Sequence, residues 1–396
     1  MTAAASAVAG TLAGCSSDPE VKPAFVTPSA PPATSKTVKP ASSSSPTVIG
    51  NGSTSYTGPQ PHQPVTERLK PGETPPQFVV FSWDGAGTAK LFERFRKLSG
   101  ELHGSMTFFL TGIYTLPRSK RKLYHPPRHP VGASAIGYLS DKAVHGCIGQ
   151  LGPAWLEGHE IGTHFNGHFC GAGGVQDWSP ADWDSEIDQA LGFVAKWRTN
   201  TGFDDLPTLP FDYKRELVGG RTPCLQGRKN LLKSEHLKTW KYDSSGTGTQ
   251  VWPTRTKGGL WNLPMQGIPF PGHSFEVISM DYNMMFNQSG TPSGDPSMHP
   301  TWKRQAREAY LAGFRRAYEG NRAPLIIGNH FENWNRGIYM DAVEEAAREM
   351  AQHSDVRLVS FKQLVAWLEA QDPKVLGKLH ALPVGQKPAG GWKSFS

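Results

Sequence analysis

The sequence contains no apolar run approaching about 18 residues, the length that a membrane-spanning helix requires, which argues against an integral membrane protein. It also contains no recognisable nucleic-acid-binding motif, although Lys and Arg outnumber Asp and Glu by 41 to 34 and give a net charge of +7. The basic residues are scattered, so we expect no nucleic-acid partner. A basic surface of this kind suits an anionic matrix such as a cell wall.

A short run of small and apolar residues opens the chain, MTAAASAVAGTLAGCSS, with Leu12-Ala13-Gly14-Cys15 near its end. This pattern resembles a bacterial lipobox, in which the cysteine becomes lipidated, so we predict lipidation of Cys15 at the end of a signal-like segment 1–15. The basic residues that normally open such a segment are missing, and we expect the natural start to lie upstream of Met1. The alternative is a disordered Ala-rich start.

Residues 16–76 are rich in Ser, Thr and Pro, a composition that cannot bury a core and predicts a disordered, extended tether. An anchor followed by a tether places the next domain, residues 77–372, outside the cytoplasm, either lipid-anchored to the membrane or secreted. Residues 373–396 are expected to form a C-terminal tail. An oxidising location permits one disulfide among Cys147, Cys170 and Cys224, which spacing alone cannot pair.

From residue 77 short apolar runs alternate with helical periodicity. Strands are predicted at 77–83, 105–112, 158–165, 216–222, 238–245, 275–282, 323–330 and 356–361. Helices are predicted at 89–98, 179–197, 302–318, 339–352 and 361–370. The second helix opens with Ser179 as a plausible N-cap and Pro180 at the first helical position. The alternation predicts an α/β fold with a parallel sheet, as a barrel or distorted barrel.

Polar residues follow several of these predicted strands. They are Asp84 after the first strand, His164 and His168 after the third, and Arg221, Asp281 and His330 after later ones. Active sites of parallel β/α folds lie at the carboxyl ends of the strands. We therefore expect these side chains to converge on one site.

The stretch GHEIGTHFNGHFC, residues 158–170, contains three histidines. A zinc protease would need His-Glu-x-x-His on a helix, but His164 comes one residue too late after His159 and Glu160, and the glycines disfavour a helix. His164 and His168 are candidate metal ligands, and a hydrogen-bonded pair of loop histidines is the alternative. His159 has no partner pattern and is expected to be an ordinary residue.

Taken in order, these segments resemble the NodB-like polysaccharide deacetylases, carbohydrate esterase family four. FSWDGAG stands where that family has Thr-Phe-Asp-Asp-Gly, and HFNGH matches its His-Ser/Thr-x-x-His spacing. RTPC at 221–224 matches Arg-x-Pro, and IGNH, which ends at His330, loosely matches Leu-x-His. The resemblance extends over residues 77–370 and implies a distorted parallel (β/α) barrel.

The resemblance also implies a function, the metal-dependent removal of acetyl groups from an N- or O-acetylated polysaccharide such as peptidoglycan, chitin or xylan. Asp84, His164 and His168 would bind a divalent metal, usually zinc, with open positions for water. A second carboxylate would take the proton from that water. His330 would protonate the leaving group, and Arg221 would steady the base.

The first motif departs from the family pattern, because the family has two adjacent aspartates and this chain has Asp84 followed by Gly85. Overlaying SWD on Thr-Phe-Asp makes Asp84 the catalytic base and leaves a metal ligand missing. Overlaying DG on Asp-Gly makes Asp84 the metal ligand and leaves the base missing. Both alignments stay open.

Three acids are candidates for the missing role: Glu160, Asp281 and Glu332. Asp281 fits best because it ends a predicted strand. We favour Asp84 as the metal ligand, since two imidazoles alone make an incomplete zinc site, and Asp281 as the base.

Two further expectations follow if the motifs converge. Cys170, just after His168, would come near Cys224, and a disulfide between them could brace the site, a buried thiol at either position being the alternative. Trp334 and Trp252 are the best candidates for stacking on sugar rings, although most tryptophans are core residues.

The function predicted from the sequence is therefore an extracytoplasmic, metal-dependent polysaccharide deacetylase, expected to be monomeric. Two alternatives remain. One is a catalytically impaired lipoprotein on the same fold that binds carbohydrate or cell wall, because the aspartate pair is incomplete. The other is a different hydrolase acting on a non-peptide C–N bond.

Overall fold

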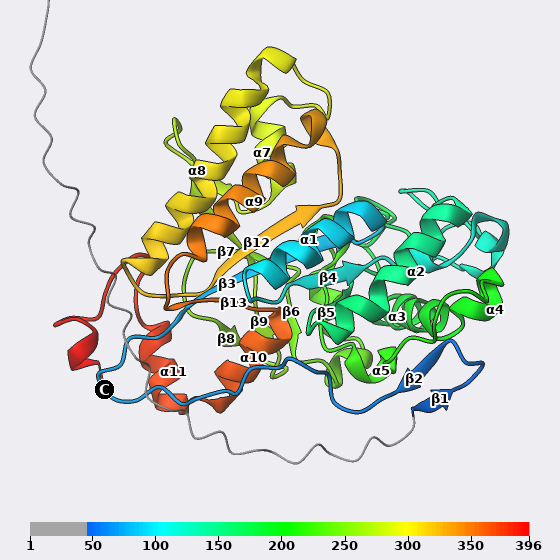
Figure 1. Ribbon diagram of the computed structural model, residues 1–396, viewed down its shortest axis with the longest axis horizontal. Coiled ribbons are helices and arrows are strands. Elements are labelled where there is room, and N and C mark those ends of the chain that lie inside the picture. The colour runs from blue at the N-terminus through cyan, green and yellow to red at the C-terminus, as the bar shows by residue number, and fades with distance from the viewer. Residues whose placement is uncertain (1–45, 396) are drawn as a thin grey trace, which may run out of the picture. The chain divides into compact units, whose positions relative to one another are not determined.

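The structure is a computed structural model that describes residues 46–395 (Figure 1). Cys15, the signal-like segment 1–15 and most of the predicted tether therefore lie outside the described residues. At the centre is a parallel sheet in the order β12-β3-β4-β5, with β13 also paired to β3. Its strands, all of them predicted, are β3 (Gln77–Gly85), β4 (Thr107–Leu110), β5 (Glu160–Thr163), β12 (Leu325–His330) and β13 (Val356–Leu358).

The register of this sheet brings several strand ends to one edge. Asp84 of β3 lies opposite His330 of β12, and Gly85 lies opposite Leu110 of β4. His164, the first residue after β5, continues the ladder by donating its backbone N–H to the Leu110 carbonyl oxygen at 2.8 Å. Asp84, His164 and His330 therefore meet at the carboxyl edge of the sheet.

β3 is buried along almost its whole length, which explains its near-continuous apolar sequence QFVVFSW. Val79, Phe81 and Trp83 belong to the apolar cluster to which helix α1 (Ala89–Glu101) contributes. Phe78 and Val80 belong to a second cluster that includes helix α10 (Phe361–Ala370). Because side chains alternate between the two faces of a strand, this one strand contributes to both cores.

Helices cover both faces of the sheet (Figure 1). They are α1 (Ala89–Glu101), α2 (Asp141–Leu156), α3 (Pro180–Ala195), α4 (Trp197–Thr201), α5 (Tyr213–Glu216), α6 (Arg228–Leu231), α7 (Asp281–Gln288), α8 (His299–Tyr318), α9 (Ile338–Met350), α10 (Phe361–Ala370) and α11 (Pro373–His380). α3 begins as predicted, because the Ser179 hydroxyl accepts the Asp182 backbone N–H and the Asp182 carboxylate accepts that of Ser179. The helices that were not predicted are α2, α4, α5, α6, α7 and α11.

Within residues 46–395 the sheet does not close into the predicted barrel. The segment 216–222, expected to be a strand, joins β5 through a single bridge between Gly220 and Thr163. A closed barrel needs a hydrogen-bonded ladder between every neighbouring pair of strands, and one bridge does not supply it. The fold is therefore an open parallel sheet with helices on both faces.

The remaining strands are short and form separate small sheets, β1-β2, β6-β9-β8 and β11-β10-β7. They are β1 (Thr47–Ile49), β2 (Thr54–Tyr56), β6 (Tyr242–Asp243), β7 (Thr247–Gly248), β8 (Thr254–Arg255), β9 (Trp261–Asn262), β10 (Met265–Pro269) and β11 (Glu276–Ile278). The strand predicted at 238–245 is reduced to β6, and that at 275–282 is divided between β11 and the first residues of α7.

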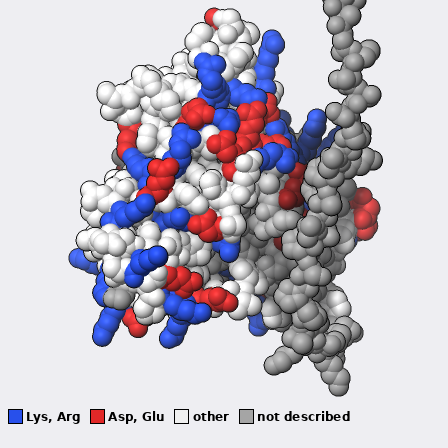
Figure 2. All heavy atoms as spheres, turned by 60° about the vertical axis from the view of Figure 1, so that its left-hand side comes forward, with Lys and Arg blue, Asp and Glu red and all other residues white. Residues whose placement is uncertain are grey.

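The face formed by α8 and α9 carries charges of both signs side by side (Figure 2). Arg307 of α8 pairs with Glu345 and Glu349 of α9, and Lys303 pairs with Glu345 at 2.6 Å. Exposed pairs of this kind contribute only about 0–1 kcal/mol each to stability. On this face the basic residues are interspersed with acidic ones and do not form a continuous basic surface.

Residues 46–76, predicted as the end of a disordered tether, are instead bound to the domain, which corrects the expected boundary. The Trp197 indole donates to the Ser53 carbonyl oxygen at 2.7 Å, and the Gln60 side-chain amide donates to the Trp155 carbonyl oxygen at 3.0 Å. Both hydrogen bonds are buried. Specific polar contacts of this kind can order a segment whose apolar content alone would not predict it.

The predicted C-terminal tail is likewise packed on the domain as far as residue 395. Leu379 of α11, Trp392 and Phe395 are buried in the same apolar cluster as α10. Across residues 46–395, none of the helices combines the length and the apolar character that crossing a membrane demands.

Candidate active site

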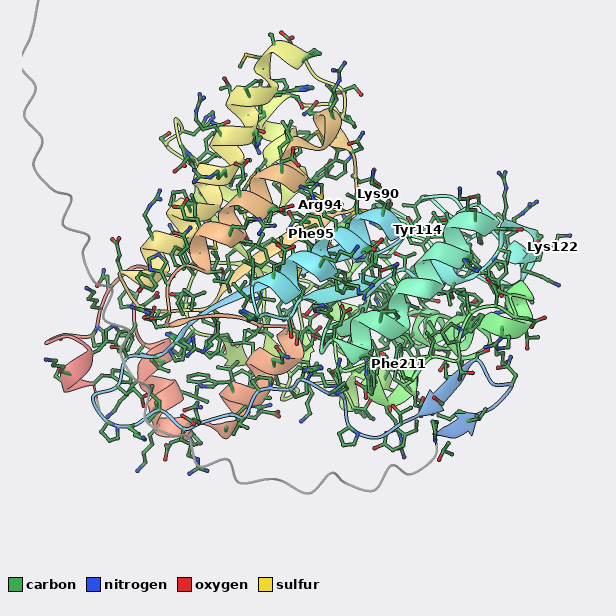
Figure 3. All side chains as sticks on the ribbon, viewed as in Figure 1. Lys90, Arg94, Phe95, Tyr114, Lys122 and Phe211 are labelled. Atoms are coloured by element: carbon green, nitrogen blue, oxygen red, sulfur yellow. A yellow bond between two sulfur atoms is a disulfide. The ribbon has the colours of Figure 1, made fainter. Side chains whose placement is uncertain are left out.

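A cavity of about 280 Å³ lies at the carboxyl ends of the central strands. Its lining includes four of the residues predicted to converge: Asp84, His164, His168 and His330. Tyr114 forms part of the wall and lies near the first turn of α1 (Figure 3). Its ring packs against Gly87, where an added Cβ would come within 2.5 Å of the ring. Neither Tyr114 nor Gly87 was singled out from the sequence.

Asp84 forms a buried ion pair with Arg221. Arg221 Nη1 lies 2.8 Å from Asp84 Oδ1, and the two side chains are 0% and 2% exposed. The guanidinium also donates to the hydroxyls of Ser82 and Ser244, both at 2.9 Å, so its buried charge is paired and hydrogen-bonded. Burial by itself would raise the pKa of Asp84, but Arg221 brings it below its ordinary value. Asp84 is thus an ionised carboxylate with one oxygen bound to Arg221.

His164 and His168 are both neutral near pH 7. His164 Nδ1 lies 2.8 Å from the Arg221 carbonyl oxygen, which can only accept a hydrogen bond, so Nδ1 carries the proton and Nε2 keeps a free lone pair. Burial lowers the pKa of His164 to about 3 and also lowers that of His168. The two rings lie 5.1 Å apart, centroid to centroid. Neutral imidazoles in this arrangement are suited to bind a divalent metal.

The loop between these histidines follows a strained path. Phe165 and His168 have positive φ angles of 59° and 56°, a region that is costly for residues other than glycine. At Gly167 there is no room for a side chain, because a Cβ would lie 2.5 Å from the Tyr124 hydroxyl. The loop must therefore be held by its surroundings.

Glu186 of α3 holds this loop and was not singled out in the sequence. Its carboxylate accepts the backbone N–H groups of Asn166 at 3.0 Å and Gly167 at 3.4 Å, and the Tyr124 hydroxyl at 2.9 Å. The Asn166 side-chain amide donates to the Glu186 carbonyl oxygen at 2.8 Å. Burial raises the pKa of Glu186 to about 7. This buried acid positions the segment that carries both histidines.

His330 is held by Asp281, the first residue of α7. Asp281 Oδ1 lies 2.8 Å from His330 Nδ1, and Oδ2 accepts the His330 backbone N–H at 2.7 Å. Burial alone would lower the pKa of His330, but the carboxylate of Asp281 raises it to about 9. Near pH 7 His330 is therefore a protonated imidazolium at the cavity, which is the form a general acid needs.

The structure distinguishes among the candidates for the second acid. Asp281, the favoured base, is fully buried with both oxygens bound to His330, which corrects that prediction. Glu160 is turned into the core, where it accepts the Thr107 hydroxyl at 2.9 Å. Glu332 lines the cavity with an exposed side chain, and partial desolvation raises its pKa. Glu332 is thus the one of the three that faces the cavity.

The donor set for a divalent metal is chemically suitable, since it combines two neutral imidazoles with an ionised carboxylate whose Oδ2 is not taken by Arg221. The spacing is looser. Among residues 46–395, the group of three potential ligands with atoms within 4.8 Å of one another is His168, Cys170 and Cys224. Asp84, His164 and His168 would have to approach one another to share an ion.

The predicted disulfide between Cys170 and Cys224 is confirmed, with Cα atoms 6.1 Å apart, and Cys147 is a buried free thiol. Cys170 Sγ lies 3.6 Å from His168 Nδ1. Because the two sulfurs are bonded to each other, they are not available as thiolate ligands. The disulfide instead joins the loop of His168 to the loop that follows Arg221.

The two tryptophans predicted to face sugar differ. Trp252 is 1% exposed and donates its indole N–H to the Asn321 carbonyl oxygen at 2.7 Å, so the prediction for this residue is wrong. Trp334, in a short 3₁₀ helix (Trp334–Gly337), is partly exposed, and its ring lies 5.2 Å from that of His330. Trp334 is therefore placed beside the candidate proton donor.

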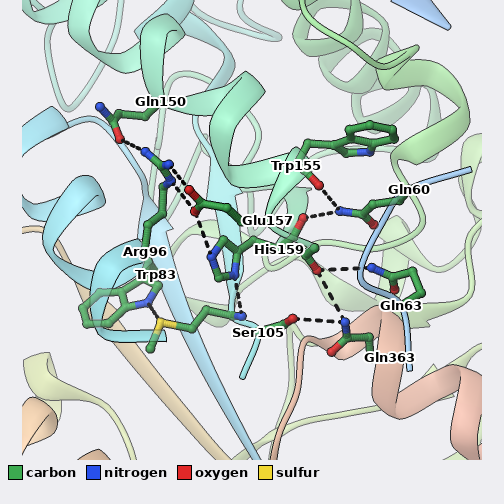
Figure 4. Close-up of polar contacts among 12 residues, drawn as sticks. Gln60, Gln63, Trp83, Arg96, Ser105, Gln150, Trp155, Glu157, His159 and Gln363 are labelled. Atoms are coloured by element: carbon green, nitrogen blue, oxygen red, sulfur yellow. Dashed lines mark hydrogen bonds and ion pairs between the residues drawn. The ribbon is translucent and has the colours of Figure 1, made fainter. Parts of the chain in front are cut away.

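His159 lies away from the cavity, in the polar network of Figure 4. Its Nδ1 accepts the Met106 backbone N–H at 3.1 Å, and its Nε2 lies 3.5 Å from Glu157, which also binds Arg96. His159 is therefore an ordinary buried histidine, as predicted.

No family model matches the chain, and no curated protein matches its sequence. Among solved structures, it is similar to a protein from Mycobacterium smegmatis described as a polysaccharide deacetylase, with 15% identity and a TM-score of 0.45 over 82% of this chain and 100% of that one. A protein from Pseudomonas aeruginosa PAO1 with a similar description matches at 13% identity and TM-score 0.43, over 74% and 91% of the two chains.

A family-four pseudoenzyme from Bacillus anthracis matches at 8% identity and TM-score 0.39, over 74% of this chain and 66% of its own. These identities and TM-scores are too low to carry information on function. The chemistry of the site has to be inferred from its side chains.

Proposed function

We propose that this protein is a metal-dependent hydrolase that removes acetyl groups from a polysaccharide outside the cytoplasm. One observation carries the proposal: a single cavity brings together neutral His164 and His168, ionised Asp84 and protonated His330. Hydrolysis of an acetyl amide or ester needs a site for a metal and an activated water, and a proton donor for the leaving group. The cavity offers both.

Asp84, His164 and His168 would hold the metal, with zinc the usual choice for such a donor set. When bound, the metal polarises the acetyl carbonyl and lowers the pKa of water. Arg221 keeps Asp84 ionised and fixed in place. Glu332 takes up the proton of the attacking water, and His330 donates a proton to the leaving nitrogen or oxygen of the sugar.

A second function is favoured by the composition of the site: within residues 46–395 Asp84, His164 and His168 do not form a group whose ligand atoms all lie within 4.8 Å of one another, and FSWDG lacks the second aspartate. A protein with this site could bind polysaccharide or cell wall without catalysing its hydrolysis. Metal content and acetate release separate the two functions.

The test compares purified wild type with His164→Ala and His168→Ala. We expect wild type to bind about one zinc per chain by elemental mass spectrometry, and to release acetate from at least one of chitin oligomers, peptidoglycan and acetylated xylan. Each variant should lose metal and activity together, because a single imidazole with a carboxylate is too few ligands for zinc.

His125→Ala is the matched control, since His125 is an exposed histidine outside the cavity lining and should change neither quantity. If wild type binds the oligomers but contains no zinc and releases no acetate, the binding function is established instead. Unchanged zinc content in both cavity variants would show that the histidines are not the metal site.

A further inference from the structure

A row of aromatic rings leads outward from the cavity, starting at His330. The Trp334 ring lies 5.2 Å from that of His330, the Tyr282 ring lies 5.8 Å from Trp334, and the Phe286 ring lies 6.3 Å from Tyr282. The row thus crosses from the loop after β12 to helix α7. Each ring contacts the next, so the row is continuous with the site of the proposed chemistry.

Helix α7 exposes the aromatic side chains of this row and buries its other apolar residues. Tyr282 and Phe286, four residues apart and therefore on one face of the helix, are 46% and 61% exposed. Met284 and Met285 are buried. Packing of the helix on the domain is thus supplied by the methionines, and stability does not require the two exposed rings.

The exposed face of α7 also carries amide groups beside its rings. In the sequence DYNMMFNQ each of the two aromatic residues is followed by an asparagine: Asn283 is half-buried, and Asn287 is exposed and its Nδ2 donates to the Asn283 carbonyl oxygen at 2.7 Å. Amides offer both hydrogen-bond donors and acceptors, and aromatic rings offer flat apolar faces. A pyranose ring has the complementary surface, with C–H groups on its faces and hydroxyl groups around its rim.

The position of α7 is tied to the proposed proton donor. Asp281, its first residue, binds both the backbone N–H and the Nδ1 of His330, and its Oδ1 also accepts the Tyr282 backbone N–H at 2.7 Å. The backbone of Tyr282 is therefore tied through Asp281 to His330. A polymer lying on α7 would be held in a constant register with the cavity.

We propose that Trp334, Tyr282 and Phe286 form a platform that binds the sugar chain beyond the unit being deacetylated. The proposal rests on the proposed function for the class of ligand, a polysaccharide with several consecutive pyranose rings. The occupant is the substrate chain itself, because the platform begins at the cavity and continues away from it without a break. The site therefore favours long chains over short ones.

The test is binding of N-acetylglucosamine oligomers, from dimer to hexamer, to zinc-free protein by isothermal titration calorimetry. For wild type we expect affinity to rise with chain length. Stacking on one aromatic ring is worth roughly a tenfold change in affinity. Tyr282→Ala with Phe286→Ala should therefore weaken hexamer binding by roughly 10- to 100-fold while the dimer loses far less, which flattens the dependence on length.

Phe275→Ala is the matched control, because Phe275 is 47% exposed and is not part of the row or of the cavity lining. It should leave the length dependence unchanged. The proposal is overturned if the double variant loses equal affinity for dimer and hexamer, or if the control loses as much affinity as the double variant. It is also overturned if wild type binds no oligomer. A different result would also overturn it: light scattering shows that wild type is a dimer and the double variant a monomer, while the affinity for the hexamer is unaltered. The rings would then be a self-association surface.

Failure of the platform and failure of the proposed function are distinguishable. Chain-length-dependent binding that depends on Tyr282 and Phe286, without acetate release by wild type, supports the platform on a protein that binds without hydrolysing. If wild type releases acetate but its affinity does not depend on oligomer length, the hydrolase is supported and the platform is rejected.

Discussion

Asp84 is the residue on which the proposed chemistry depends most, and its environment restricts what it can do. Arg221 occupies Oδ1 at 2.8 Å and keeps the carboxylate ionised. A carboxylate with a lowered pKa is a weak proton acceptor but a suitable metal ligand. Glu332 has the opposite property, since partial desolvation at the cavity wall raises its pKa. The two acids therefore suit different roles.

These roles predict different defects in two variants. Asp84→Asn should lose metal affinity and turnover together, because an amide is an uncharged and poorer ligand. Changing even a supporting carboxylate costs about 10–100-fold in metal affinity, and a direct ligand should cost at least as much. Glu332→Gln should keep its zinc and lose about 100- to 10,000-fold in turnover, the usual contribution of a general base. Zinc titration and acetate release measure the two quantities.

Glu319→Gln serves as the control, because Glu319 is an exposed acid remote from the cavity lining. If Asp84→Asn retains wild-type zinc affinity but not turnover, Asp84 is the base, as in the other alignment of FSWDG. If Glu332→Gln retains full turnover, Glu332 has no part in proton transfer.

At the residue scale, the sequence predicted the groups whose signal is local. The spacing of His164 and His168 and the position of Asp84 at the end of an apolar strand can be read without any knowledge of the fold. Convergence was predicted but the individual pairings were not, since Asp281 binds His330 across 49 positions of sequence and Arg221 binds Asp84. Trp252 was misplaced for the same reason, since burial of an indole depends on neighbours that are remote in sequence.

At the element scale, α3 was predicted because both its N-cap and its apolar stripe are formed by residues close together in the sequence. The predicted closed barrel does not form, because residues 216–222 contribute a single bridge where a strand was expected. Helix α7 was missed because its residues continue an apolar run, FEVISM, that is typical of a strand. Tertiary packing on β12 and α8 decides its conformation instead.

The role of Glu186 on α3 leads to a prediction about pH. Burial raises its pKa in the folded state to about 7, above the ordinary value of 4.5. The folded state therefore binds this proton more tightly than the unfolded chain does. The stabilisation is fully present below pH 4.5 and is lost as pH rises through about 7, a change of about 3 kcal/mol.

Glu186→Gln should remove this part of the pH dependence, because glutamine does not ionise in this range. The free energy of unfolding, from urea titrations at pH 5, 6, 7 and 8, should fall less with pH in the variant than in wild type. Glu235→Gln, at an exposed carboxylate, should keep the wild-type slope. Identical slopes for wild type and Glu186→Gln would contradict the prediction.

At the scale of the whole molecule, the folded domain is larger than the sequence suggested. Within residues 46–395, β2 and Gln60 bind the body of the domain through Leu209 and Trp155, and Trp392 and Phe395 are buried in its apolar cluster. Composition gave the wrong boundary, since Ser, Thr and Pro are abundant in tethers but do not exclude specific buried hydrogen bonds. The segment available as a tether is correspondingly shorter.

Attachment of the protein to the membrane should depend on Cys15. We expect Cys15, at the end of Leu12-Ala13-Gly14-Cys15, to carry the lipid that holds the protein outside the cytoplasm. A net charge of +7 could also bring the protein to anionic lipids, but that attraction is screened at about 1 M salt, where the Debye length falls to roughly 3 Å. A high-salt wash of isolated membranes therefore separates the two causes.

The protein is expressed in a bacterial host that lipidates its proteins, and its membranes are washed in this way. Wild type and the control Ser17→Ala should stay in the membrane fraction. Cys15→Ala should move to the soluble fraction, with its acetate release per chain unaltered. Retention of Cys15→Ala after the wash, or release of wild type by salt alone, would show that the lipid is not the anchor.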